Sequence, residues 1–380
     1  MPAYLTHLAA FLPHQPVPSQ RIESVLGMIA NAPSAVKDLI LERNGIKWRY
    51  YAIDPATGRA THTNAELTAE AIRRLLDETG LPAESIDLLA CGTSSPDQLA
   101  PSHAAMVHGV LRCPPCEIVS MAGVCCSSMG ALRYAQNSVL TGSTERAVVT
   151  GSELASAALK ASQYEHHNGA SAVANPYVGF SQEFLRFMLS DGAGAALVES
   201  QPRPGSLALR IDWLEMRSYA NEIEACMYSG ATKEADGSLR GFRMEPGGVD
   251  EAVRKGYFNL SQDVSVLGEK MVKIAARYFT EVYRRHDLDA SAIDWILPHL
   301  SSYFFQQPIY EEMAKYGWSV SPERWFTNLK YKGNTGAASI FIMLEELFKS
   351  GKLKAGQRIL CMVPESARFT FACMHLTVVA

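Results

Sequence analysis

Two stretches of this chain, far apart in the sequence, share one build. Residues 69–95 (AEAIRRLLDETGLPAESIDLLACGTSS) and 275–302 (AARYFTEVYRRHDLDASAIDWILPHLSS) each carry the pattern of an amphipathic helix, a short turn and an apolar strand that ends in small polar residues. Ile86 and Ile293 take matching places in the two strands and are 207 positions apart. The pattern predicts that one supersecondary unit occurs twice in the fold.

A second pair of stretches repeats in the same order. Residues 131–153 and 341–366 each read as a helix closed by glycine, at Gly142 and Gly351, and followed by an apolar strand. Their offset is 209 positions, close to that of the first pair. Chance likeness between short amphipathic elements is the alternative, but agreement in order and offset favours a tandem α/β repeat, with its boundary in the Pro- and Gly-containing residues 199–211.

The repeat predicts two halves, residues 1–204 and 205–380. In the first half, Asn64 is a plausible N-cap of a helix that ends at Gly80. Several apolar runs are too continuous for a sheet with one wet face and indicate central strands that are covered on both faces. The expected fold class is therefore layered α/β, with helices outside and between the sheets. The strands of the first half are expected near residues 86–92, 117–123, 146–151 and 193–198.

Charge and composition indicate an ordinary globular protein. The chain has 35 basic and 39 acidic residues, and 19% of its residues are charged and 47% hydrophobic. This balance creates no strong electrostatic field that would attract nucleic acid or a membrane surface. No run approaches the roughly 18 uncharged apolar residues of a membrane span, and the N-terminus lacks an export signal. We therefore expect a cytoplasmic protein without nucleic-acid or membrane partners. The eight cysteines lack the spacing of a disulfide framework, which favours reduced thiols.

Two adjacent cysteines, Cys125 and Cys126, lie where the apolar run EIVSMAGV changes to a helical pattern. A helix N-terminus stabilises a thiolate through its partial positive charge and its free N–H groups. The same N–H groups can hold the oxyanion that forms when a thioester carbonyl is attacked. A buried structural cysteine is the alternative for either residue. The strand-to-helix turn favours a chemical role for one of the two.

Two further residues occupy positions suited to chemistry. His299 follows the apolar run IDWILP, and Asn334 lies between glycines in YKGNTGAAS, before a helical pattern. A histidine at a strand end is often a hydrogen-bonded core residue, and Gly-Asn-Thr-Gly alone is a turn that leads into a capped helix. His299 and Asn334 indicate a chemical role only when they are considered together with the two cysteines.

Taken together, these segments resemble the β-ketoacyl-acyl-carrier-protein synthase III group of condensing enzymes in the thiolase superfamily. The likeness runs over almost the whole chain, through ERNGIKWRYYA, GTSSPDQLAPSHAAMVHGVL, SDGAGAAL, IDWILPH, GNTGAAS and SGKLKAGQRIL. The resemblance implies an internally duplicated five-layer α-β-α-β-α fold, a homodimer, no cofactor and no metal. It also implies a catalytic Cys-His-Asn triad, which a gap-free match of the helix ALRYAQNSVLTG assigns to Cys125, His299 and Asn334.

The resemblance also implies roles. Cys125 would attack an acyl thioester and hold the acyl chain while the carrier leaves. His299 and Asn334 would then donate hydrogen bonds to the carbonyl oxygen of the second thioester and stabilise its enolate. The backbone N–H groups of Cys125 and Ala367 would form the oxyanion hole. However, PESARFTF replaces the glycine-rich loop of the family around Ala367, so this loop must take another path, because residues with a Cβ disfavour positive φ angles.

Other departures concern substrate recognition. By the resemblance, Leu39 replaces the tryptophan that stacks on adenine in members that use coenzyme A, while Arg43 keeps a basic residue in RNGIKWR. Phe304 replaces an arginine that assists carrier docking, and Lys270 and Lys315 are either substitutes or solvated surface lysines. The expected partners are therefore acyl-carrier-protein or CoA thioesters, with the carrier protein favoured.

The acyl pocket is also expected to differ from the family. Residues 94–102, with Leu99, are one residue longer than the loop that closes the acyl tunnel across the dimer, and residues 160–190 form an aromatic-bearing insertion. We expect Leu99, Ser302 and Phe369, with Arg43 and Phe304, to bind substrate. VPESARF and FLRFMLSDGAGA resemble the branch of dialkylresorcinol and related pathways, where two long acyl chains are joined.

The predicted function is an acyltransferase that performs Claisen condensation of thioester-bound acyl chains in fatty acid or polyketide metabolism. An acyltransferase of the same fold that forms an ester or amide is the first alternative, and a non-catalytic partner in a heterodimer is the second.

Two other patterns contain residue types that bind metal ions. CPPC (Cys113 to Cys116) and the pair His166 and His167 have metal-ligand chemistry, but a single C-x-x-C is weak evidence for zinc, so a proline turn is favoured.

Overall fold

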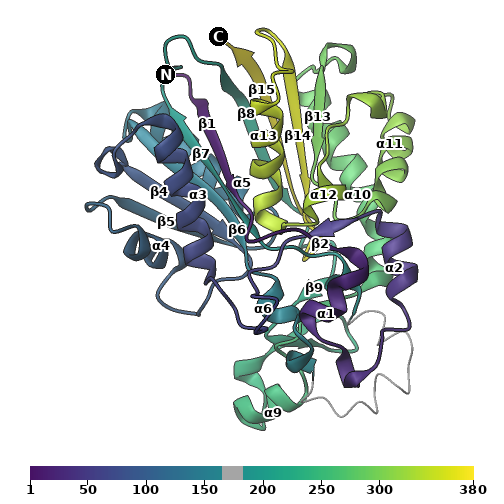
Figure 1. Ribbon diagram of the computed structural model, residues 1–380. Coiled ribbons are helices and arrows are strands. Elements are labelled where there is room, and N and C mark those ends of the chain that lie inside the picture. The colour runs from purple at the N-terminus through teal and green to yellow at the C-terminus, as the bar shows by residue number, and fades with distance from the viewer. Residues whose placement is uncertain (165–182) are drawn as a thin grey trace.

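The computed structural model describes residues 1–164 and 183–380, and its main element is a mixed sheet of nine strands in the order β13-β14-β15-β8-β1-β7-β6-β4-β5 (Figure 1). The chain termini lie together at one end of this sheet. The strands are β1 (Tyr4–Phe11), β4 (Leu88–Thr93), β5 (Glu117–Ala122), β6 (Arg146–Glu153), β7 (Gly192–Glu199), β8 (Ala208–Ser218), β13 (Trp295–Pro298), β14 (Arg358–Pro364) and β15 (Thr370–Val379).

The sheet consists of two runs with the same pairing pattern. In the first run, β1 is antiparallel to β7, β7 is antiparallel to β6, and β6, β4 and β5 are parallel. In the second run, β8 is antiparallel to β15, β15 is antiparallel to β14, and β14 is parallel to β13. A parallel bridge from Ile296 to Trp325 stands where the first run has β5. The duplication expected from the sequence is present.

The two runs join at a corner. β1 and β8 pair through two residue pairs only, Tyr4 with Arg210 and Leu5 with Leu209. Each run therefore forms a separate face with its own helical cover. Helices α5 (Ser127–Thr141) and α13 (Ser339–Lys349) share one apolar core with residues of both runs.

The outer faces of the two runs are covered separately. Helices α3 (Asn64–Thr79) and α4 (His103–Leu111) pack on the first run, and helices α10 (Val264–Arg285) and α11 (Gln306–Lys315) pack on the second. The order helix, sheet, helix, sheet, helix is the predicted five-layer α/β fold, which is confirmed. The shorter elements are β2 (Val17–Pro18), α1 (Ile22–Leu26), α2 (Lys37–Asn44), β3 (Trp48–Arg49), α6 (Ser156–Leu159), β9 (Met227–Tyr228), β10 (Ala231–Lys233), β11 (Leu239–Gly241), α9 (Gly248–Arg254), β12 (Ser261–Gln262) and α12 (Leu329–Lys332).

The start of α3 corrects one prediction. The N-cap is Thr63, whose side chain accepts from the backbone N–H of Glu66 in a capping box, and not Asn64. Asn64 is the first helical residue, and its buried amide donates to Thr93 Oγ1 and to the Ser95 carbonyl, so it ties the helix to the end of β4. The helix ends at Gly80 in the left-handed conformation, as expected.

Two glycines let the central layer approach the first sheet closely. A Cβ built on Gly92 in β4 would lie 2.4 Å from the backbone nitrogen of Ser128, and one on Gly151 in β6 would lie 2.2 Å from the carbonyl oxygen of Ala337. Neither distance is compatible with a real side chain. The first turn of α5 and the turn before α13 can therefore lie directly on β4 and β6, because these two strand residues carry no Cβ.

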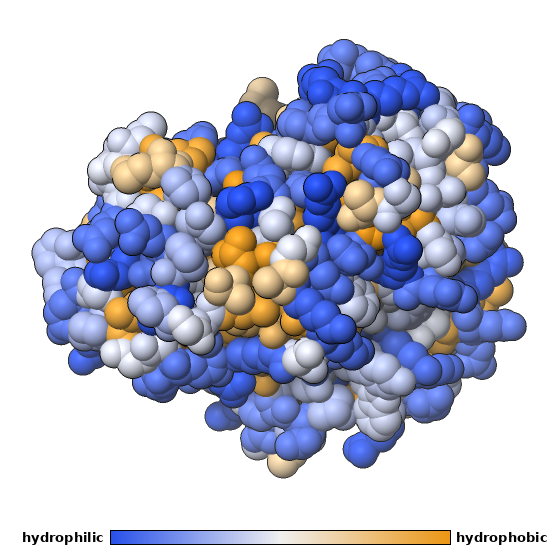
Figure 2. Space-filling model, turned by 90° about the horizontal axis from the view of Figure 1, so that it is seen from above, coloured by the Kyte–Doolittle hydropathy of each residue, from blue (hydrophilic) through white to orange (hydrophobic). Residues whose placement is uncertain are grey.

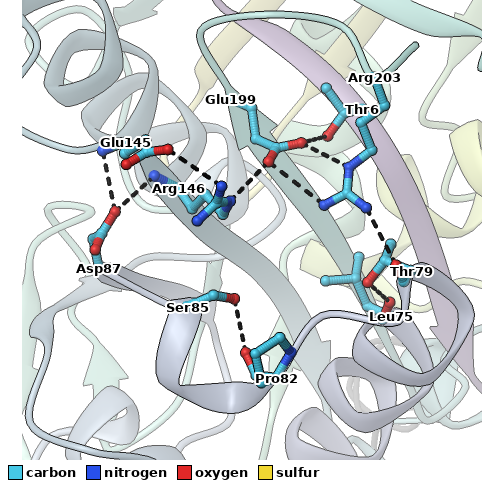
Figure 3. Close-up of polar contacts among 10 residues, drawn as sticks. All are labelled: Thr6, Leu75, Thr79, Pro82, Ser85, Asp87, Glu145, Arg146, Glu199 and Arg203. Atoms are coloured by element: carbon cyan, nitrogen blue, oxygen red, sulfur yellow. Dashed lines mark hydrogen bonds and ion pairs between the residues drawn. The ribbon is translucent and has the colours of Figure 1, made fainter.

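Charged residues tie the strands together at the end of the sheet that holds the chain termini (Figure 3). The carboxylate of Glu199 at the end of β7 forms ion pairs with Arg146 at the start of β6 and with Arg203, and it accepts from Thr6 of β1. The carboxylate of Asp87 accepts from the backbone N–H of Arg146. These contacts fix strand register far from the opposite end of the sheet.

The surface seen from the terminal end is mainly hydrophilic, with apolar groups between polar ones (Figure 2). Among residues 1–164 and 183–380, no helix is both long and apolar enough to cross a membrane. All eight cysteines carry free thiols.

Candidate active site

A cavity of about 500 Å³ is lined by residues that follow β4, β5, β6, β13 and β14. These strands end on the side of the sheet opposite the chain termini (Figure 1). Parallel strands bring the residues that follow them to one edge, so segments distant in sequence meet there. Cys125, His299 and Asn334 all line this cavity. The structure therefore brings together the three residues that the sequence assigned to a triad.

Cys125 lies in the tight turn between β5 and α5. Its side chain lines the cavity and is 8% exposed. The neighbouring Cys126 points elsewhere: its thiol donates to the carbonyl of Val363 at 3.2 Å and faces that of Thr370 at 3.5 Å. Cys126 is the N-cap of α5. The two thiols are therefore distinct, and only Cys125 faces the cavity.

The electrostatic environment of Cys125 differs from the expectation for a helix N-terminus. Burial raises the pKa of this thiol well above its usual value, and the carboxyl groups of Glu365 and Glu153 raise the pKa further. The effect of the N–H groups is outweighed because the thiol is buried and two carboxyl groups lie near it. Cys125 is therefore a neutral thiol in the free protein at neutral pH.

His299 directly follows β13, and its backbone N–H donates to the carbonyl of Met362 at 2.7 Å. The residue is 2% exposed, and burial lowers the pKa of the imidazole to about 4. The ring is therefore neutral at physiological pH and can donate one hydrogen bond. This is the protonation state that an uncharged donor to an enolate oxygen requires.

Asn334 follows Gly333, whose φ of 73° turns the chain out of α12. The backbone carbonyl of Asn334 accepts from Ser190, and its side-chain Oδ1 accepts from the backbone N–H of Gly336 at 3.0 Å. Since the side-chain oxygen is occupied in this way, the amide NH₂ group is the part left to donate to a ligand.

Glu153, at the end of β6, forms the cavity wall between the two halves. Its buried carboxylate accepts from the hydroxyls of Ser94 and Ser95 and from the backbone N–H of Ala337. Burial raises the pKa of Glu153 despite these donors. The residue ties the end of β4 to the turn before α13, and the sequence analysis did not single it out.

The loop that replaces the family's glycine-rich turn takes its own path. Phe369 alone in this loop has a positive φ, of 57°, whereas Ser366, Ala367 and Arg368 do not. The carbonyl of Ala367 accepts from the backbone N–H groups of Cys226 and Met227, and Ala367 does not line the cavity, although Ser366 does. The position of Ala367 therefore does not support the predicted role of its backbone N–H in an oxyanion hole.

The five residues expected to bind substrate do not line the cavity. Arg43, Leu99 and Phe304 are exposed on the surface, Leu99 to 76%. Ser302 caps a short helix through its hydroxyl, and Phe369 is fully buried in the core beneath α10. The altered path of the loop accounts for the buried position of Phe369, and the substrate-binding roles of the five residues stay predictions.

Other residues form the apolar wall. It is formed by the described part of the segment before β7, the β9 turn, helix α10 and the residue after Phe304. The sequence analysis missed these residues because each comes from a different element. The insertion predicted over residues 160–190 lies partly outside the described residues. The main apolar wall residues are Leu185, Met188, Met227, Met271, Leu300 and Phe305.

The CPPC segment has a neighbour that the sequence did not reveal. His108, near the end of α4, places a ring nitrogen within 4.8 Å of the thiols of Cys113 and Cys116. This group has soft, zinc-compatible ligands, but it contains three residues, and structural zinc sites use four. His166 and His167 lie outside the described residues.

Comparison with known proteins agrees with this architecture. The sequence profile described as "Thiolase, N-terminal domain" matches residues 53–184, and the profile described as "3-Oxoacyl-[acyl-carrier-protein (ACP)] synthase III C terminal" matches residues 283–377. A β-ketoacyl-[acyl-carrier-protein] synthase III of Neisseria meningitidis is 27% identical over 322 residues, which is 84% of each chain. The chain is a synthase III-like member of the thiolase superfamily.

Solved structures share the fold of this synthase III-like chain. AbyA1, a tetronic acid condensing enzyme, superimposes with a TM-score of 0.73 at 22% identity and 99% coverage of both chains. An OleA variant from Xanthomonas campestris gives a TM-score of 0.76 at 20% identity, with 99% of this chain and 98% of that chain covered. These structures show a shared fold, and the match to the synthase III profile and to the Neisseria synthase III indicates an acyltransferase of the condensing type.

Proposed function

We propose that the protein joins two thioester-bound acyl chains by Claisen condensation, with Cys125, His299 and Asn334 as its catalytic residues. One observation carries the proposal: these side chains come from two halves of the chain and line a single buried cavity. A nucleophile beside two neutral donors suits a reaction with an acyl-enzyme and then an enolate.

In the first stage, the sulfur of Cys125 attacks the carbonyl carbon of an acyl thioester. The new S–C bond forms as the bond to the carrier sulfur breaks, so the acyl chain stays on the enzyme. The backbone N–H of Cys125 supports the developing oxyanion from the turn before α5. Burial favours this stage because water cannot compete as the acceptor of the acyl group.

In the second stage, the other thioester enters and its α-carbon loses either carbon dioxide or a proton, so that the electron pair of the broken bond forms the enolate. The imidazole of His299 and the amide of Asn334 donate to its carbonyl oxygen and stabilise the enolate. The enolate carbon attacks the carbonyl carbon of the Cys125-bound acyl group, a carbon–carbon bond forms as the bond to the Cys125 sulfur breaks, and the sulfur takes up a proton to restore the thiol. Since the imidazole is neutral, it can donate without adding a positive charge to the dry site.

The cavity wall indicates apolar acyl groups as substrates. Leucine, methionine and phenylalanine supply 11 of the 32 described lining residues, and none of the described lining residues is Lys or Arg. OleA, which has the same fold, has been seen with lauric acid and lauroyl-CoA. We extend this to acyl-carrier-protein or CoA thioesters of medium or long chains, joined as in dialkylresorcinol-type pathways.

Each half has its own part in this proposal. Residues 1–204 supply the nucleophile and its helix, and residues 205–380 supply the histidine and the asparagine. The exposed edge of the sheet points to a homodimer, because β5 leaves one side unpaired and its Ile118 is 38% exposed. Leu99, on the loop after β4, would then reach the partner subunit.

The test is a panel of acyl-carrier and acyl-CoA thioesters, from acetyl to lauroyl, with intact-mass detection of acyl-enzyme and product analysis. The expected result is an adduct on the wild type that Cys125→Ala loses, and a product with a new carbon–carbon bond. An ester or amide product would instead support acyl transfer to oxygen or nitrogen. Absence of any adduct would indicate a non-catalytic subunit of a heterodimer and refute the proposal.

A further inference from the structure

A buried carboxyl group lies against the turn that carries Cys125, and the proposed reaction does not yet use it. Glu365 follows β14 in the loop that replaces the glycine-rich turn, and it is 7% exposed. The backbone N–H groups of Val124 and Cys126, which flank the nucleophile, and that of Arg368 hydrogen-bond with its carboxyl group. A Cβ on Gly123 would lie 4.0 Å from Glu365 Oε2.

This contact explains how a loop without glycines can seal the site. The carboxyl group satisfies two N–H groups at the start of α5 that water or a ligand would otherwise take. It does so on both sides of Cys125 and leaves the N–H of Cys125 itself out of the contact. Glu365 therefore stabilises the backbone turn that orients the thiol of Cys125, and it places a negative charge next to this thiol.

Among the residues that the structure describes, no Lys or Arg side chain faces this charge. The titratable groups that face Glu365 and the thiol are few: the neutral His299 after β13, Glu153 at the end of β6, and Cys126 beside the nucleophile. Arg368 contributes a backbone amide while its side chain is exposed. If Cys125 lost its proton to solvent, a thiolate would stand beside a buried carboxylate in a dry cavity, which is electrostatically costly.

We propose that Glu365 positions Cys125 and shares one proton with it, so that Glu365 accepts the thiol proton as the acyl group is transferred. This inference rests on the proposed function. The site then carries a single negative charge throughout, either as carboxylate and thiol or as carboxylic acid and thiolate.

The step balances without a co-reactant. The S–H bond of Cys125 breaks and its proton passes to a Glu365 oxygen as the sulfur–acyl bond forms. The bond between the acyl carbon and the carrier sulfur then breaks, and Glu365 returns the proton to the departing carrier thiolate. The products are acyl-enzyme and free carrier thiol, with Glu365 again a carboxylate.

The experiment compares wild type, Glu365→Gln and Glu365→Asp in two assays. The first assay is the pH dependence of iodoacetamide alkylation of Cys125, followed by intact mass and corrected with Cys125→Ala. The second is the rate of acyl loading from the thioester that loads the wild type fastest. The glutamine keeps a backbone acceptor and removes the charge, and the aspartate keeps the charge on a shorter chain.

Opposite responses of Glu365→Gln in the two assays are expected. The alkylation midpoint should fall by about one pH unit or more, because the thiolate no longer faces a carboxylate. Acyl loading at neutral pH should fall about 100-fold, because the proton acceptor is lost, and should recover at alkaline pH. Glu365→Asp should keep the alkylation midpoint of the wild type and load more slowly than the wild type.

If Glu365 only stabilises the structure, the alkylation midpoint of Glu365→Gln will equal that of the wild type. This result would overturn the proposal. Faster acyl loading together with faster alkylation in Glu365→Gln would also overturn the proposal, because Glu365 would then only disfavour the thiolate of Cys125. If Glu365→Gln does not fold, an alkylation midpoint of Glu365→Asp that falls below that of the wild type is the contrary result. A wild type that loads no thioester refutes the Claisen proposal instead, and the alkylation assay still tests the shared proton.

Discussion

In the first half of the molecule the turn before the central helix α5 presents Cys125 to the cavity, whereas in the second half the turn before α13 presents Asn334. The equivalent strand ends also differ, because β4 is followed by Ser94 and β13 by His299. The scaffold is the same in both halves, and the side chains at its ends differ. One repeated unit can therefore supply a nucleophile in one copy and hydrogen-bond donors in the other.

The edges of the two halves differ as well. The first half ends in β5, a six-residue strand, while the second half has only the bridge from Ile296 to Trp325 in that place. In the second half the strip beyond β13 is covered by α11 and the chain around Trp325. The first half thus keeps an open edge that can pair with another subunit, and the second half does not.

The sharpest test of this division of labour is Cys125→Ala. We expect it to abolish the acyl adduct, because the nucleophile is removed, whereas Cys126→Ala should keep the adduct, because its thiol faces the carbonyls of Val363 and Thr370. Intact mass after incubation with an acyl thioester measures both. An adduct that Cys126→Ala loses and Cys125→Ala retains would reverse the assignment.

Alteration of the second half should separate the two stages. We expect His299→Ala and Asn334→Ala each to lower condensation by about 100- to 1,000-fold, because each removes a donor to the enolate oxygen. Both variants should still form the acyl-enzyme at a rate within about tenfold of the wild type, since the first stage belongs to Cys125. Product formation and intact mass are measured on the same samples. Loss of loading equal to the loss of condensation would contradict a stage-specific function of the second half.

The close approach between halves can be broken at β6. Gly151→Ala should destabilise the fold by about 3 kcal/mol or more, because the new methyl group would meet the backbone carbonyl of Ala337. Gly268→Ala in α10 is the matched control: its Cβ meets nothing within 4 Å, and alanine favours the helix by up to ~1 kcal/mol. Chemical denaturation measures both. Equal midpoints for the two variants would show that the central layer can move away from the sheet.

A buried histidine of the first half gives the smallest of the four effects. His103 lies between Thr68 and Ser152, and burial lowers the pKa of its imidazole to about 4. The unfolded chain therefore takes up the proton before the native chain does, so stability falls as pH drops from about 6.5 toward 4.

The measurement is the difference in unfolding free energy between the wild type and His103→Asn. This difference should shift by about 2 kcal/mol against the wild type between pH 7 and pH 5, because only the wild type carries the buried titrating ring. The comparison cancels the buried carboxyl groups common to both proteins. A difference that does not change with pH would show that the ring titrates equally in the native and unfolded states, and hence that burial does not lower its pKa.

Local patterns predicted much of the scaffold. The helix over residues 64–79, its end at Gly80 and the strands around residues 88, 117, 146 and 193 followed from periodicity and from continuous apolar runs. These features depend on neighbours in sequence, so they could be read without coordinates. The N-cap was misplaced by one residue because both Thr63 and Asn64 are good caps, and the contact of Asn64 with the end of β4 decided between them.

The candidate site was predicted less evenly. Cys125, His299 and Asn334 follow strands or precede central helices, and such positions converge at one edge of the sheet in any α/β fold of this kind. Glu153, Glu365 and the ligand-like position of His108 gave no signal in the sequence. Their significance comes from neighbours that are distant in the chain.

By itself, the amino-acid sequence determined the repeat, the order of helices and strands, and which residue types stand at the strand ends, since these depend on local spacing and propensity. Only the tertiary structure decided which cysteine faces the cavity, that its thiol is neutral, and that a carboxyl group from the last loop holds its turn. These properties arise from burial and from charges that more than two hundred residues of chain separate, and no local pattern encodes such contacts.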